Sequence, residues 1–590
     1  MKKNKLYIGL LLCFFISSCE LDYENTETIN PDNVWNNKGM ISAFLTDLYG
    51  SHMPGWPMSG ASSDEAINGG GGNLSNYLRG IINVENDYSQ GFDYVKIDKV
   101  NFLLEKLETI PESVLSATEN NEIKGQALFW RAWDYWRRVS LVGGIPLITK
   151  FQDVTNRESL FIPRNKTSEC MQQILKDLDD AIGYLPDKWE SVNYGRIDKG
   201  AAMAFKGRVL LWYASPLFNP SGDQGRWEAA YTANKAAVDF LKNTGRGLYP
   251  DYKKIWKDER NMEAIIVNQF YYSDHTYNTN AYRPEPITKD ASNNDQPILP
   301  LLLAYPKKDG SPLNLDIEKL NDPAYNESFL TDFYTNRDSR FYATIFCGGQ
   351  VYPTPDFSDN QRYWCTWVEV EDQYTSLAYY QMNRSSNYGK SGFFSLKAID
   401  ETLTMPNVAN GGVDWIEMRF AEVLMNYGEC ANETGKTNEA LQVLYDIRKR
   451  AGIEEGSGNY GVTAATRDDI REAYINERFV EFAFEGKRFG DLRRWKRFDI
   501  LNKHQYRAGL YTVLNPGEEY ISFDWKSDIS DPEVRKKFHA VYIENLDGEP
   551  QYKYDLTLNH WFYPIRKNDL DRNSKLEQNN EWGGTFDPLQ

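Results

Sequence analysis

The chain has 590 residues, long enough for one large domain or several small ones, each with an ample core. Its net charge of -18 and its pI of about 5.0 argue against a nucleic acid as partner. Aromatic residues make up 14% of the chain, with 16 Trp and 38 Tyr. A core uses many of them, and a surplus of Tyr and Trp suits an exposed sugar-binding or protein-binding surface.

The first residues have the layout of a secretory leader. A lysine-rich start precedes an apolar run over residues 6–16, which is too short to span a bilayer. The run ends in two serines and Cys19, which resembles a bacterial lipobox. An ordinary cleavage site beside a chance cysteine is the alternative. We expect a signal peptide over 1–18, lipidation of Cys19, an acidic tether over 19–30, and attachment to the outer membrane by several acyl chains.

Apolar residues at three- and four-residue steps predict helices in the region 31–267. The expected helices cover residues 93–107, 121–141, 168–185, 199–215 and 227–242. Ser168 is expected to cap the third of them. Antiparallel pairs with alanines and aromatics at the facing positions are typical of tetratricopeptide-type scaffolds, although long loops make the period irregular.

Helical periodicity is lost from residue 268 to about 399, where Pro, Gly, Asn, Asp and Tyr become frequent. We therefore predict a loop-rich module over 268–414 with short strands, one of them in the run 341–346. The last region, 415–590, is expected to combine helices with loops. Its predicted helices cover 415–434, 438–451 and 466–485.

Cysteines and histidines do not suggest a metal centre. Cys170, Cys347, Cys365 and Cys430 are widely spaced without a CxxC pair, and the five histidines lack HExxH spacing. We expect no metal, no cofactor and no histidine-based nucleophilic catalysis. Cys347 and Cys365 can close a loop in an oxidising compartment, and the more common alternative is that both are buried free thiols.

A family resemblance rests on the stretch NERFVEFAFEGKRFGDLRRW over residues 476–495. It resembles the C-terminal hallmark of the SusD/RagB family, and further matches occur in order along the mature chain. They lie at residues 125–149, 336–340, 419–432, 447–452, 563–565 and 578–582. Trp130 and Arg566 depart from the usual pattern. The resemblance implies a mainly α fold, in which a tetratricopeptide-like helical-pair scaffold carries a loop-rich module with short strands.

The charges of the hallmark are interpreted as structural. Glu477, Glu481 and Glu485 follow at four-residue steps and should share one helix face. Neighbouring arginines, Arg478, Arg488 and Arg494, are expected to pair with these carboxylates or to cap backbone carbonyls, because buried charges are tolerated when they are paired. A catalytic carboxylate pair is the weaker alternative, since these glutamates share a helix with arginines rather than facing each other across a cleft.

The resemblance implies a surface-exposed outer-membrane lipoprotein that is not an enzyme. It would deliver glycans to a SusC-like TonB-dependent transporter, as a hinged lid over the barrel. Two alternatives stay open: a peptide-binding, RagB-like importer subunit, and a helical-toroid glycoside hydrolase.

The glycan site is expected to form from two segments that lie outside the helical pairs. A sugar needs an aromatic platform for its C–H face and Asn, Asp or Arg side chains for its hydroxyls. The first segment, residues 51–92, offers Trp56, Asp64, Tyr77, Arg79, Asn83 and Tyr88. The central module offers Tyr272, Tyr282, Tyr363, Trp364, Trp367, Asn383 and Arg384. Any single aromatic among them is more often a core residue than a platform, and we expect two or three contact residues in the set. Asp64 with Glu65 can equally be structural. Neutral sugars need no net charge in the site, which fits an acidic chain.

Overall fold

The computed structural model describes most of the chain beyond the tether. The described ranges are 34–55, 60–69, 73–82, 84–85, 91–152, 155–278, 282–284, 294–356, 362–376, 390–518 and 526–590. The expected signal peptide, Cys19 and the tether lie outside them. Within these ranges, no helix combines the length and the apolar character that crossing a bilayer requires.

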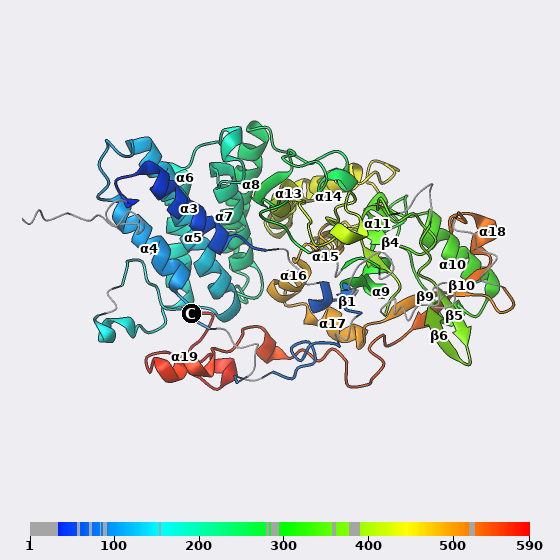
Figure 1. Cartoon of the computed structure of the whole chain (residues 1–590). Helices are drawn as coiled ribbons and strands as arrows, with labels where there is room; N and C mark the ends of the chain where they lie inside the picture. The colour runs from blue at the N-terminus through cyan, green and yellow to red at the C-terminus, as the bar shows by residue number, and fades with distance from the viewer. Residues whose placement is uncertain are drawn as a thin grey trace, which may run out of the picture.

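The N-terminal part is a stack of helices that pack in pairs, at one end of the molecule (Figure 1). Its helices are α3 Lys38–His52, α4 Val95–Leu107, α5 Ala117–Val142, α6 Thr167–Tyr184, α7 Lys199–Ala214 and α8 Gln224–Asn243. Helix α5 packs on α6 and α7 packs on α8. Local signals set the ends: Ser116 and Glu119 form a capping box at the start of α5, and Gly143, at φ 79°, ends it.

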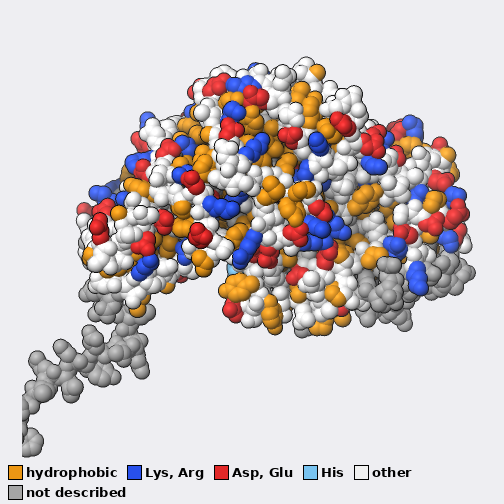
Figure 2. Space-filling view, turned by 90° about the horizontal axis from the view of Figure 1, so that it is seen from above, with side chains coloured by type: hydrophobic (Ala, Val, Ile, Leu, Met, Phe, Trp, Pro, Cys, Tyr) orange, Lys and Arg blue, Asp and Glu red, His pale blue; other side chains and the backbone are white. Residues whose placement is uncertain are grey.

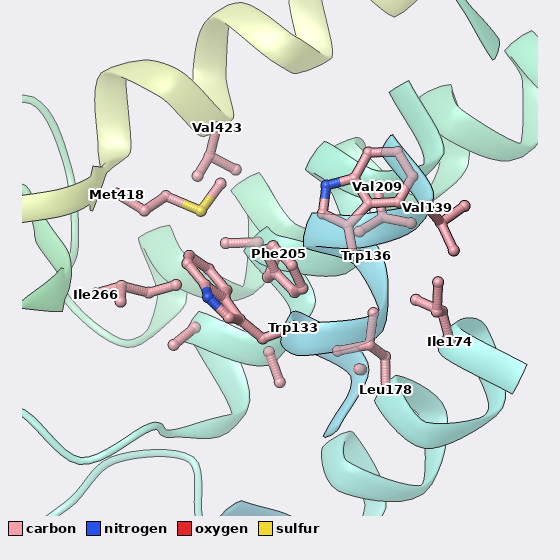
Figure 3. Packing of buried hydrophobic residues seen from close by; sticks show 14 of the residues in the cluster. Trp133, Trp136, Val139, Ile174, Leu178, Phe205, Val209, Ile266, Met418 and Val423 are labelled. Carbon is pink, nitrogen blue, oxygen red and sulfur yellow. The ribbon is translucent and has the colours of Figure 1, made fainter. Parts of the chain in front are cut away.

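The C-terminal helices continue this stack toward the middle of the molecule (Figure 1). They are α13 Phe420–Glu433, α14 Thr437–Arg450, α15 Arg467–Glu481, α16 Arg488–Arg494 and α17 Phe498–His504. Helix α13 packs on both α8 and α14. One hydrophobic core therefore joins the two ends of the sequence. Figure 3 shows Met418 and Val423 from the C-terminal part packed with Trp133, Phe205 and Ile266.

Strands β2 Ala264–Asn268 and β8 Trp415–Arg419 pair in antiparallel fashion, with Asn268 opposite Trp415. The intervening residues 269–414 thus leave and re-enter the scaffold at one place. They contain α9 Leu299–Ala304, α10 Pro323–Thr335, α11 Ser339–Thr344 and the short strands β3 Gln296–Pro297, β4 Ile345–Phe346, β5 Trp367–Val370, β6 Gln373–Ser376 and β7 Phe394–Ser395. At the far end of the molecule, a sheet of order β10-β9-β5-β6 adds β9 Gly509–Leu514 and β10 Phe538–Ile543 (Figure 1).

The remaining elements tie distant segments together. Strand β1 Ala66–Ile67 pairs with β3, so the segment after α3 packs on the central module. The short helices α18 Pro532–Arg535 and α19 Lys567–Arg572 lie in the last part of the chain. The C-terminal tail returns to the first helices, where Thr167 donates its hydroxyl to the carbonyl of Pro588 at 2.7 Å.

The predicted fold class is confirmed: the molecule is mainly α, a helical-pair scaffold with a loop-rich module. Three boundaries were predicted incorrectly. Residues 415–419 form β8 rather than the start of a helix, because they pair with β2. The run 341–346 is mostly α11, capped by Asp338, with only Ile345–Phe346 extended. The hallmark helix ends at Glu481, four residues early, because Phe484 and Gly486 take positive φ values.

Two further local predictions need correction. The central module contains the 13-residue helix α10, although helical periodicity was expected to be absent there; Asp322 caps it and Pro323 starts it. Helix α6 begins at Thr167 after Lys166, so Ser168 is not its cap. All four described cysteines are free and buried, so Cys347 and Cys365 are not bonded to each other in this structure.

Candidate functional site

The hallmark charges build a buried network, here named the Glu481 lattice. Its members are Glu263, Asp338, Arg340, Lys397, Arg419, Arg450, Glu477, Glu481 and Glu485. Glu481 accepts hydrogen bonds from Arg340 at 2.8 Å and Arg419 at 2.7 Å, and it also pairs with Arg450. Burial alone would raise the pKa of Glu481, but the three arginines hold it well below its usual value. The three hallmark glutamates are thus buried and paired, as expected, but the predicted partners are wrong: their cations come from other segments of the chain and not from Arg478, Arg488 or Arg494.

The hallmark arginines themselves pair with other carboxylates. Arg478 and Arg494 both bind Asp491, at 2.8 Å each. Arg488 forms a bidentate ion pair with Asp64, with N–O distances of 2.8 and 2.7 Å. Asp64 is only 1% exposed, so of its two possible roles it takes the structural one.

Glu65, beside Asp64, is buried without a direct cationic partner in the described contacts. Its carboxylate accepts a hydrogen bond from the Phe484 amide at 2.9 Å and another from the Ser63 hydroxyl at 2.9 Å. Burial raises its pKa to about 8 in spite of these two bonds. Glu65 is thus a buried acid near the physiological titration range, and it fixes the turn that follows α15.

Most described aromatic candidates lie in the interior. Tyr282, Tyr363, Trp364 and Trp367 are 6%, 2%, 3% and 7% exposed. The Trp364 ring stacks on Phe538 with centroids 5.5 Å apart, and Trp367 stacks on Tyr511 at 3.9 Å. The expectation that these rings face solvent is wrong. Trp364 and Trp367 thus pack on rings of β10 and β9, whereas Tyr363 lies in a separate core cluster with Phe346 and Phe394.

Tyr77 is also buried, at 4% exposure, with its ring stacked on Tyr563 at 4.9 Å. It lines a small pocket of about 270 Å³ together with Glu65 and Phe489. Arg79 is half-buried, and its guanidinium donates to the Gln551 carbonyl at 3.1 Å. The candidates Trp56, Asn83, Tyr88, Asn383 and Arg384 lie outside the described residues.

The two expected segments do meet, at the end of α3. The Asn268 amide, at the end of β2, donates to the Pro54 carbonyl at 2.9 Å. Beside this contact, Tyr271 and His275 exchange two backbone hydrogen bonds that close a short hairpin. The Tyr271 and Tyr272 side chains on this hairpin are 54% and 75% exposed. Among the central aromatic residues that the sequence suggested and the structure describes, Tyr272 is exposed to solvent, whereas Tyr282, Tyr363, Trp364 and Trp367 are buried.

Two adjoining pockets lie at this place, and we name them together the Tyr194 groove. The first, about 400 Å³, is formed by Thr46, Tyr49 and Gly50 of α3, by Met53 after it, by residues 192–196, by the end of β2 and by His275. The second, about 270 Å³, extends past Trp189 and Thr244 to residues 260–262. Both are lined by residues 193–196 and Val267. Their combined size suits an oligosaccharide or a short peptide.

The groove offers the chemistry that a polar ligand needs. Amides of Asn193, Asn268 and Gln269 line the first pocket, together with the Tyr49 and Tyr194 residues. The side chains come from α3, the loop before α7 and β2, which are far apart in sequence. Local patterns did not point to Asn193, Tyr194 or Arg196, because only the packing of α3 against β2 brings them together.

No described group of three or more His, Cys, Asp or Glu side chains is arranged to hold a metal ion. Over the outer face seen in Figure 2, acidic and basic side chains are interspersed with apolar ones. In this setting the concave, amide-rich groove is the candidate binding site, and its chemistry is recognition by hydrogen bonds and ring contacts.

The sequence matches two models of known protein families. The SusD family model matches residues 254–582, more than half of the chain, and a second model, described as starch-binding associating with outer membrane, matches 71–211. A SusD-like protein P2 of Formosa agariphila is 24% identical over 392 residues, which are 64% of this chain and 65% of that protein. The chain thus spans slightly less than two thirds of that relative's length.

Solved structures share the fold. A SusD-like protein from Bacteroides fragilis superposes with a TM-score of 0.68 at 23% identity, covering 93% of this chain and 98% of the other. A SusD-like carbohydrate-binding protein from the same species gives a TM-score of 0.67 at 20% identity, covering 92% and 99%. The helical-toroid alternative is left without support. By its sequence signature, this chain belongs to the SusD/RagB family.

Proposed function

We propose that this protein binds oligosaccharides in the Tyr194 groove and delivers them to a SusC-like TonB-dependent transporter, without cleaving them. The observation that carries the proposal is the pair of exposed tyrosines, Tyr271 and Tyr272, on the hairpin beside an amide-lined groove. Flat rings match the C–H face of a pyranose, and the amides match its hydroxyls. Membership in a family with a carbohydrate-binding structural neighbour supports the same ligand class.

The binding test uses the chain from Glu20 onward, which keeps every described residue. A glycan panel and a peptide mixture are titrated calorimetrically side by side. Exchanging both tyrosines, Tyr271→Ala with Tyr272→Ala, should weaken glycan binding at least tenfold, a loss of about 1.4 kcal/mol. The control is Phe151→Ala, a ring that is 41% exposed and outside the groove. Binding of peptides alone would replace the glycan proposal with the RagB-like one.

The absence of catalysis is tested in the same samples. Incubation with each bound glycan should release no new reducing ends. The Glu481 carboxylate pairs with Arg340, Arg419 and Arg450 in the interior, so it is not placed to act on a bound glycan. This pairing supports a binding role without cleavage. Steady release of reducing ends that scales with protein concentration would contradict the proposal.

The location and the partner are proposed from the leader and the family. Cys19 is the expected lipid attachment site on the outer-membrane surface, and the second family model is described as associating with the outer membrane. Cys19→Ala should abolish labelling with a fatty acid and release the protein from membranes. Affinity purification of the lipidated protein from its native membranes should recover a TonB-dependent transporter; recovery of the protein without any such transporter would contradict the delivery role.

A further inference from the structure

The lining of the Tyr194 groove has more basic than acidic side chains. Its charged lining residues are Lys188, Glu190, Arg196, Asp198, Arg246 and Arg260. Asp198 and Arg246 pair with each other at 2.7 Å. Lys188, Arg196 and Arg260 have no carboxylate within ion-pair distance among the described residues, although Lys188 acts on Asp198 and Arg260 on Asp414 through space. Apart from the Asp198–Arg246 pair, the lining thus holds three cations and the single carboxylate of Glu190. A local excess of cations is unexpected in a chain with 84 acidic and 66 basic residues.

Arg196 shows the excess most clearly. Its guanidinium reaches only neutral groups: the Gln126 side-chain oxygen at 3.4 Å, the Thr46 hydroxyl at 3.5 Å and the Tyr49 ring at 5.8 Å. Hydrogen bonds of this length are weak. A guanidinium has five N–H donors, so Arg196 keeps donors for a ligand.

Arg260 and Lys188 extend the positive charge into the second pocket. The Arg260 guanidinium lies 4.9 Å from the centre of the Tyr194 ring, on the wall that both pockets share. This cation–π contact holds the guanidinium beside the groove without removing its charge. The groove is therefore cationic along its length, with Arg196 between the two pockets.

Acidic groups on the neighbouring elements do not offset this charge in the first pocket. None of its described lining residues is a carboxylate. Asp274 on the hairpin accepts a bond from Ser273 and is not part of the lining. Asp414 accepts the Phe270 amide at 3.0 Å, and burial raises its pKa to about 6.

From these contacts we propose that the Tyr194 groove selects acidic oligosaccharides, which carry carboxylate or sulfate groups, over neutral ones. The inference rests on the proposed function and narrows it to one substrate class. Charge-assisted bonds to an anionic group are about twice as strong as neutral ones, so Arg196 and Arg260 can set this preference while the amides bind hydroxyls. Sequence composition alone pointed the other way, to neutral sugars.

The test compares matched ligands on the chain from Glu20 onward. Oligogalacturonate, alginate oligosaccharides and a sulfated galactan oligosaccharide are titrated, each beside its carboxyl-reduced or desulfated counterpart, together with neutral glucans. At least one acidic member should bind more than tenfold more tightly than its neutral counterpart. Its affinity should fall as salt rises from about 0.05 to about 0.5 M, because screening weakens exposed ion pairs. The two kinds of acidic ligand separate carboxylate from sulfate recognition.

Substitution of the groove arginines tests whether they cause the preference for acidic ligands. Arg196→Gln combined with Arg260→Gln should reduce the acidic-to-neutral affinity ratio at least fivefold and leave the melting temperature nearly unchanged. The matched control is Arg137→Gln, an exposed arginine of α5 that does not line the groove. It should leave the ratio unaltered. An unchanged ratio in the double variant would overturn the assignment.

The remaining outcomes separate the two proposals. If neutral glycans bind as tightly as their acidic counterparts, the acidic preference is wrong and oligosaccharide binding stands. If no glycan of either kind binds, the proposed function fails and the preference fails with it.

Discussion

The Glu481 lattice and the Tyr194 groove are both rich in arginine, yet they use it in opposite ways. In the lattice, Arg340, Arg419 and Arg450 converge on one buried carboxylate, and each charge has a partner. In the groove, Arg196 contacts only neutral groups at the limit of hydrogen bonding. A conspicuous charge motif can therefore serve folding alone. The candidate binding surface lies where cations have no carboxylate within ion-pair distance among the described residues and tyrosine rings are exposed.

The largest effect is expected when the carboxylate shared by the three arginines is removed. Glu481→Gln keeps the shape of the side chain but leaves Arg340, Arg419 and Arg450 facing a neutral amide in the interior. We expect a loss of about 5 kcal/mol in the free energy of unfolding, the upper end for a broken buried pair, because three arginines lose the same partner. Urea denaturation measures the change.

A matched control for Glu481→Gln exists on the same helix. Glu472 pairs with Arg497 at the surface, where its side chain is 59% exposed, so Glu472→Gln should cost less than about 1 kcal/mol. Ligand affinity per folded molecule should stay the same in both variants. Equal stability losses in the two variants would show that the lattice is no more important than a surface pair.

The aromatic residues divide in the same way. Trp364→Ala removes a ring that is 3% exposed and stacked on Phe538, so we expect a loss of about 3 to 4 kcal/mol in unfolding free energy. Affinity per folded molecule should not change. Thermal denaturation and titration of the folded fraction provide the two measurements.

Tyr272→Ala is the counterpart of this variant, because its ring is 75% exposed. It should change stability by less than about 0.5 kcal/mol and weaken glycan binding. A stable Trp364→Ala protein that no longer binds glycan would restore Trp364 as a ligand platform.

The sequence predicted that the lattice glutamates are buried and paired, because Glu477, Glu481 and Glu485 recur at four-residue steps. It did not predict their partners, because Arg340, Arg419 and Arg450 come from other segments of the chain, whereas the arginines between and after the glutamates pair elsewhere. Helices with strong periodicity, such as α4, α5 and α14, were predicted to within a few residues at each end. Strand β8 was missed because its extended shape comes from pairing with β2, about 150 residues away along the chain.

The candidate site was harder to predict for the same physical reason. Whether an aromatic side chain is exposed depends on which distant segments pack over it, and Trp364 and Tyr272 have similar local surroundings in the sequence. Arg196 carries no local signal, since its neighbours Gln126 and Thr46 come from other helices. The sequence did indicate the two segments that meet, which the contact between Asn268 and Pro54 brings together.

The two kinds of buried acid should also respond to pH in opposite directions. The pKa of Glu481 is lowered, so its contribution to stability is present above pH 4.5 and is lost as the pH falls through the folded-state value. The pKa of Glu65 is raised to about 8, so the folded state binds its proton more tightly than the unfolded state. Stability from Glu65 is therefore present below pH 4.5 and declines as the pH rises toward 8.

Glu65→Gln tests this sign, because glutamine imitates the protonated acid at every pH. The stability of the variant relative to the natural protein should rise steadily between about pH 5 and pH 8. Urea denaturation at several pH values measures the difference, which cancels the titration of histidines common to both proteins. A constant difference over this range would mean that Glu65 titrates normally.

A modest effect on both stability and binding is expected at the contact that joins the scaffold to the groove. Asn268→Ala removes the amide that donates to the Pro54 carbonyl at 2.9 Å, at the place where the end of α3 meets β2. One partly buried hydrogen bond contributes about 1 kcal/mol, so the loss of unfolding free energy should be of that order. Glycan affinity should fall about three- to fivefold, because Asn268 both lines the first pocket and holds residues 53–55 in place.

Asn268→Asp separates these roles: its carboxylate cannot donate to the carbonyl, and it places a negative charge in the cationic groove. If acidic ligands set the specificity, Asn268→Asp should weaken their binding more than Asn268→Ala does, while the affinity for neutral counterparts should fall similarly in both variants. Equal losses for acidic ligands would show that charge in the groove does not control binding.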